Sequence, residues 1–130
     1  MCKVHRYAAT LPLLLVALLV ALLVATASAC KAETSISDYP CPKEGTKLTY
    51  ENFGAPYLAQ NCQVCHGQSA DDRKGAPPGF DFGTIEQVRE HKDRIFARAA
   101  ADNVTMPPGP DDPPSEQRYQ LAEWLACGAP

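Results

Sequence analysis

The chain has 130 residues, with 12 lysines and arginines, 15 aspartates and glutamates, a formal net charge of −3 and six cysteines. This length is typical of one small domain. No basic patch with interleaved aromatic side chains is present, which argues against a nucleic-acid-binding protein.

The first 29 residues have the pattern of an export signal. Lys3 and Arg6 come first, an apolar run extends from Leu11 to Val24, and the small residues of ATASAC follow. This order of basic, apolar and small segments is typical of a secretory signal. We therefore predict that residues 1–29 form a signal peptide and that the remaining chain is exported.

The end of this segment can be processed in three ways. A signal peptidase could cut after Ala29, or the stretch Ala27–Cys30 could act as a bacterial lipobox, with Cys30 as the lipidated first residue. Alternatively, residues 11–29 could stay as an uncleaved membrane helix, because about 20 residues span a bilayer. We favour lipidation of Cys30, with residues 31–40 as a polar tether and residues 41–130 as the domain.

The cysteine count supports this choice. Export leaves five cysteines, in a compartment where paired thiols oxidise. If Cys62 and Cys65 are used together and Cys30 carries lipid, then Cys41 and Cys127 remain as one pair. No thiol is then left over, which favours the lipobox.

A first helix is predicted to approach Cys62. Apolar side chains recur at helical spacing between Tyr50 and Leu58. Pro56 lies inside this pattern and cannot donate a backbone N–H. The regular helix should therefore start near Gly54 or Ala55, with Pro56 in its first turn.

Two further helices and two loops follow. A capping box, Thr84-x-x-Gln87, opens a helix to about residue 100, and Ser115 is the predicted N-cap of a helix that stops at Gly128. Residues 71–83 and 102–114 are loops rich in proline and glycine. With no strand-like alternation, the fold class is predicted to be all-α with three main helices. A hydrophobic core this small is expected to need an additional stabilising group at its centre.

The sequence NCQVCHG, residues 61–67, admits four interpretations: a zinc site, a redox dithiol, a structural disulfide or covalent haem attachment. Zinc needs four ligands, and no second close pair of cysteines exists. A redox dithiol is expected beside βαβ units, which the pattern lacks. For haem, Cys62 and Cys65 would bond the two vinyl groups and His66 would bind the iron. We favour this interpretation, since the motif is specific in an exported chain.

A haem iron held on both faces needs a second axial ligand. In the exported chain, His91 and Met106 are the candidates. Met106 precedes Pro107 and Pro108, and a residue before proline is held extended, so its side chain can be presented by stiff backbone. His91 is expected on a helix surface between charged neighbours. We therefore predict Met106 as the second ligand.

With these residues identified, the chain from about residue 46 to residue 128 resembles the class I c-type cytochromes, specifically the small single-haem proteins of bacteria. Cys62, Cys65 and His66 match the haem-attachment motif, and Met106 with Pro107 matches the axial methionine. The resemblance also matches four positions where the first and last helices of the family pack together: Gly54, Leu58, Leu121 and Trp124. Pro56 departs from the family's pattern.

The resemblance implies a cytochrome c fold around one covalently bound haem c. It implies that Pro77 or Pro78 offers the carbonyl that accepts the N–H of His66. Cys41 and Cys127 are not part of the family motif, but they lie at the two ends of the domain, where we predict a disulfide.

The implied function is electron transfer in the periplasm by a monomer that is not an enzyme. Redox partner proteins would dock transiently, and a lipid anchor at Cys30, or an uncleaved N-terminal helix, would hold the chain at a bacterial membrane. The alternative is a haem-based gas sensor or weak peroxidase, in which Met106 leaves the iron.

Overall fold

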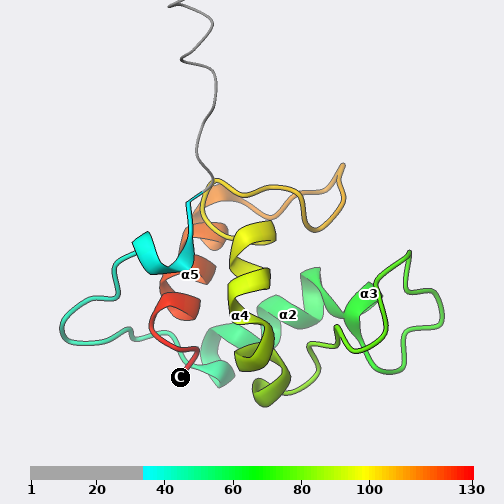
Figure 1. The fold of residues 1–130 in the computed structure, drawn as a ribbon, viewed down its shortest axis with the longest axis horizontal. Helices are drawn as coiled ribbons and strands as arrows, with labels where there is room; N and C mark the ends of the chain where they lie inside the picture. Colours follow the sequence, from blue (N-terminus) through cyan, green and yellow to red (C-terminus); the bar gives the residue numbers. More distant parts are fainter. Residues whose placement is uncertain (1–33) are drawn as a thin grey trace, which may run out of the picture. The chain divides into compact units, whose positions relative to one another are not determined.

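A computed structural model of the chain describes residues 34–130 (Figure 1). Within this range the regular structure is helical and no strand occurs, which confirms the predicted all-α class. The elements in chain order are η2 (Ile36–Asp38), η3 (Tyr50–Gly54), α2 (Ala55–Asn61), α3 (Gln63–His66), α4 (Ile85–Ala99) and α5 (Ser115–Ala126).

The predictions for the signal peptide and for Cys30 lie outside the described residues. Among residues 34–130, none of the helices combines the length and the apolar character that crossing a bilayer requires.

The first predicted helix is formed by η3 and α2 in succession. Thr49 and Asn52 make a reciprocal capping box, in which each side chain accepts a hydrogen bond from the other residue's backbone N–H. The turn of η3 is wide, with the Ala55 N–H bonding the Tyr50 carbonyl. Pro56 then lies in the first turn of α2, as predicted, where its missing N–H removes no bond within that helix.

Helix α4 begins as the sequence predicts. The Thr84 side chain accepts from the Gln87 N–H at 3.3 Å, and the Gln87 side chain accepts from the Thr84 N–H at 3.1 Å. The predicted cap of α5 is wrong by one residue. Ser115 is already helical and makes no capping bond, because the extended backbone of Pro114, with ψ 143°, occupies the N-cap position.

The core lies where α2, α4 and α5 meet, with α4 and α5 side by side (Figure 1). Its largest fully buried side chains are Trp124, Phe96, Leu58, Leu121, Leu125 and Val88. The first and last helices meet at Gly54, as the resemblance implied. A Cβ atom at Gly54 would lie 2.5 Å from Cζ2 of Trp124, so only glycine fits against this ring.

Replacing Gly54 with alanine is therefore expected to destabilise the domain by about 1–3 kcal/mol, since the fully buried Trp124 has little room to move. Urea unfolding measures this. Gly83→Ala is the matched control, because its Cβ would meet nothing closer than 3.5 Å. The control should stay within about 0.5 kcal/mol of wild type. Equal midpoints for the two variants would contradict the close packing.

The described part of the predicted tether, residues 34–40, is not a free linker. The ring of Tyr39 lies edge-on to Phe96 of α4 with centroids 5.7 Å apart, and η2 contacts both α4 and α5. The Thr34 carbonyl accepts from Asn103 Nδ2 at 3.3 Å. The apolar residues Ile36, at the start of η2, and Tyr39, directly after it, both pack on the core.

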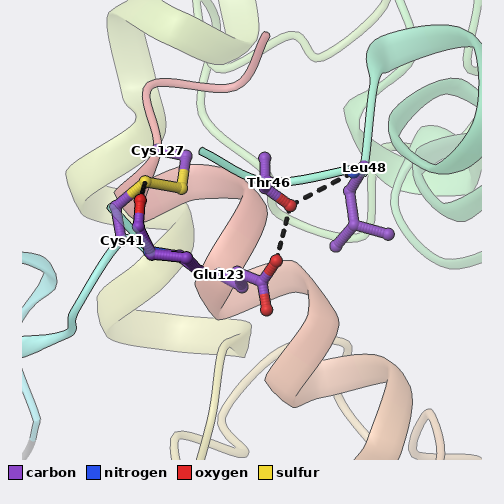
Figure 2. Close-up of a disulfide and its surroundings, with 6 residues drawn as sticks. Cys41, Thr46, Leu48, Glu123 and Cys127 are labelled. Carbon is purple, nitrogen blue, oxygen red and sulfur yellow. Dashed lines mark hydrogen bonds between the residues drawn. A yellow bond between two sulfur atoms is a disulfide. The ribbon is translucent and has the colours of Figure 1, made fainter. Parts of the chain in front are cut away.

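The predicted disulfide between Cys41 and Cys127 is present, with Cα atoms 5.1 Å apart (Figure 2). It joins the segment before η3 to the end of α5. Beside it, Thr46 donates a hydrogen bond to Glu123 Oε1 at 2.5 Å and accepts one from the Leu48 N–H at 3.1 Å. The two ends of the domain are thus joined both covalently and by hydrogen bonds.

Candidate functional site

A cavity of about 330 Å³ brings together the four side chains singled out for haem binding: Cys62, Cys65, His66 and Met106. The first three lie at the start of and within α3, whereas Met106 lies on the loop between α4 and α5. His91 does not line the cavity. Of the two candidates for a second ligand, Met106 is thus the one that shares a cavity with His66.

The two cysteines and His66 are held on a single turn of helix. Helix α2 ends at Asn61, and Cys62 leaves helical geometry with φ −121°. The Cys62 carbonyl then accepts from the N–H groups of Cys65 and His66 at 3.1 and 2.8 Å. This tight turn places all three side chains at the same cavity.

The His66 ring is oriented by the loop that follows it. Its Nδ1 lies 2.7 Å from the Phe80 carbonyl, and its face stacks on Phe82 with centroids 4.4 Å apart. A carbonyl can only accept, so Nδ1 carries the proton, and in the neutral ring Nε2 is then the nitrogen with the free lone pair. This is the tautomer that a metal-binding histidine requires.

The expectation that Pro77 or Pro78 would accept this bond is wrong. The Pro77 carbonyl is already engaged by the Phe80 N–H and by Arg73. Gly79, with φ +85°, then turns the chain in a way that residues with a side chain rarely adopt. The carbonyl that reaches His66 is therefore that of Phe80.

The thiols of Cys62 and Cys65 are not bonded to each other. Burial, with a smaller contribution from Cys65, raises the pKa of the Cys62 thiol to about 12. Redox-active dithiols have the opposite property, a lowered pKa that provides thiolate for attack. Among residues 34–130, no three His, Cys, Asp or Glu side chains are grouped as a metal site would need.

Backbone bonds to α4 hold the Met106 loop. The Arg98 carbonyl accepts from the N–H groups of Thr105 and Met106 at 3.0 and 2.9 Å. The Met106 side chain is 39% exposed, which is unusual for a methionine that only fills a core. His91 instead bonds the Gly79 carbonyl through Nε2 at 2.9 Å and stacks on Phe80.

The rest of the lining fits a large, mostly apolar group that carries anionic substituents. The walls include aromatic, proline and aliphatic side chains, with four cations: Arg73, Lys74, Arg94 and Arg98. The Tyr57 hydroxyl at the wall is buried and has no hydrogen-bond partner among the described residues. Burial raises the pKa of this phenol, so it remains a donor in need of an acceptor. A haem would offer both apolar faces and carboxylates, and the donor set fits it.

Sequence patterns had not singled out Tyr57, Arg73, Phe80 or Phe82. The roles of Arg73, Phe80 and Phe82 depend on the path of the loop after His66, which local periodicity does not encode. In the sequence, the aromatic pair in the stretch GFDFG, residues 79–83, was the one feature that could have pointed to Phe80 and Phe82.

Comparison of the chain with models of protein families, with characterised proteins and with solved structures found no match. The residues around the cavity are therefore the basis for inferring a function.

Proposed function

We propose that the chain is a c-type electron-transfer protein with one covalently attached haem. Cys62 and Cys65 would hold it through thioether bonds, and His66 and Met106 would be its axial ligands. The observation that supports this most strongly is that Met106, far along the chain from the other three, lines the same cavity.

Haem bound there would supply an iron that gains and loses one electron. The chain's own residues fix the site around that iron. The Phe80 carbonyl and the Phe82 ring hold His66 in one orientation, with Nε2 available. The Arg98 carbonyl anchors the backbone at Met106. Ligands that are held in place in both oxidation states keep reorganisation small, and a methionine ligand favours the reduced form.

Electron transfer requires no acid–base residue, so we propose that the chain is not an enzyme. Partner proteins would dock briefly, through interfaces at the small end of the range for protein complexes. We further propose that Cys30 carries lipid and holds the domain on the periplasmic side of a bacterial membrane.

One second candidate is a haem-based gas sensor or weak peroxidase, because Met106 lies on a loop between α4 and α5 and not on a helix. If Met106 left the iron, a diatomic gas or peroxide could take its place. The hydrogen bonds from residues 105 and 106 to Arg98 argue for the carrier, since they restrain the loop.

An absorption spectrum distinguishes the two functions. The carrier should show a methionine–iron charge-transfer band in the far red when oxidised. Its reduced spectrum should be unchanged by carbon monoxide, because Met106 stays bound. A carbon monoxide shift in freshly reduced protein at neutral pH would favour the sensor or peroxidase instead.

A further inference from the structure

One side chain, Arg73, organises the loop between His66 and Phe82. Its guanidinium donates to a carboxylate, Asp81 Oδ1, at 2.6 Å. It also donates to four backbone carbonyls in the loop: Gly67 at 3.3 Å, Ala76 at 3.3 Å, Pro77 at 3.1 Å and Phe80 at 3.4 Å. Only arginine has five N–H donors in a rigid fork that can make so many bonds at once.

One of these contacts connects Arg73 to His66. The Phe80 carbonyl accepts from both side chains, from His66 Nδ1 at 2.7 Å and from Arg73 Nη2 at 3.4 Å. A carbonyl oxygen has two lone pairs and can accept both bonds. Because Arg73 is a cation, its bond polarises the carbonyl and leaves less electron density for the His66 N–H.

Arg73 also lines the cavity itself, and its side chain is only 27% exposed. Its charge is therefore less screened there than a charge at the surface would be. A positive charge beside the site disfavours the oxidised iron, which carries one more positive charge than the reduced iron. The carboxylate of Asp81, 19% exposed, partly offsets that charge.

We propose that Arg73 is a positioning residue for His66, and that the Arg73–Asp81 pair sets how strongly the site favours the reduced state. This inference rests on the function proposed above. Both effects of Arg73 favour the reduced state of the site. Its bond to the Phe80 carbonyl makes His66 a weaker electron donor, and its charge opposes oxidation.

Substitutions at Arg73 and Asp81 separate the effect of the Arg73 charge from its role in fastening the loop. Arg73→Gln removes the charge and most of the bonds. Arg73→Lys keeps the charge but loses the fork. Asp81→Asn leaves the charge of Arg73 uncompensated. Arg89→Gln is the matched control, because Arg89 bonds the Ala129 carbonyl at 3.0 Å and does not line the cavity.

The experiment is a redox titration of each matured variant, preceded by intact mass. At a fixed ambient potential, Arg73→Gln should lower the ratio of reduced to oxidised protein by roughly threefold to tenfold, the scale of the net free energy of one typical hydrogen bond. Asp81→Asn should raise this ratio of reduced to oxidised protein. The ratio of Arg73→Lys should be closer to that of wild type, and the ratio of Arg89→Gln should equal it. In both Arg73 variants, the His66 Nδ1 proton should exchange faster by NMR, because the loop that carries the Phe80 carbonyl is less firmly held and opens more often.

Each outcome decides the proposal. If the Arg73→Gln and Arg89→Gln ratios both equal that of wild type, Arg73 only fastens the loop and the proposal fails. If Arg73→Gln does not mature, Asp81→Asn still decides it, because a ratio no higher than that of wild type would overturn the proposal. A wild-type chain without added haem mass overturns the proposed function, and this inference falls with it.

Discussion

Replacing Cys62 and Cys65 together with alanine is expected to abolish covalent haem attachment. The two sulfurs lie on one turn, at the wall of the cavity that His66 and Met106 share. Without them no thioether can form, although the other lining residues are untouched. Intact mass under denaturing conditions should then equal that of the polypeptide with any acyl chains. Each single substitution should leave one thioether.

The disulfide cysteines provide the control for this result. Cys41 and Cys127 do not line the cavity and are already bonded to each other, so their removal should leave haem attachment intact. If the Cys62/Cys65 double variant kept the haem, or if the Cys41/Cys127 variant lost it while folded, the cysteines would have been assigned to the wrong roles.

Removing the Cys41–Cys127 bridge is expected to have the largest effect on stability. The bridge closes a loop spanning 86 positions. The chain-entropy model gives a loop of this size roughly 4–5 kcal/mol, which is a large fraction of the typical stability of a small domain. Urea unfolding of the Cys41→Ala/Cys127→Ala variant, under oxidising conditions and with haem content matched, measures the loss.

A neighbouring hydrogen bond provides the comparison for the bridge. Thr46→Ala removes the bond to Glu123, beside the bridge, but leaves the covalent link in place (Figure 2). This change should destabilise the domain by only about 0.5–1.5 kcal/mol. If the two variants lost similar amounts, chain entropy would not be the source of the effect of the bridge.

Features set by local sequence were predicted well. The capping box at Thr84 starts α4 where expected, and Pro56 lies in the first turn of α2. Each depends on residues within one turn of the chain. The contact between Gly54 and Trp124 was expected from the family resemblance, and the bridge from the cysteine count and the two ends of the domain.

Other features set by packing between distant segments were not predicted. The choice of the Phe80 carbonyl for His66 depends on a turn at Gly79 and on the bonds of Arg73. The docking of η2 depends on the core surface offered by α4 and α5. A polar composition pointed to a tether at residues 31–40, but in its described part, residues 34–40, two apolar side chains pack on the core.

The most direct test of the account is the intact mass of the secreted, matured wild-type chain, measured under denaturing conditions. The proposal predicts a coloured protein whose mass exceeds that of its amino acids and any acyl chains by one haem, because thioether bonds survive unfolding. A colourless protein without that added mass would contradict it.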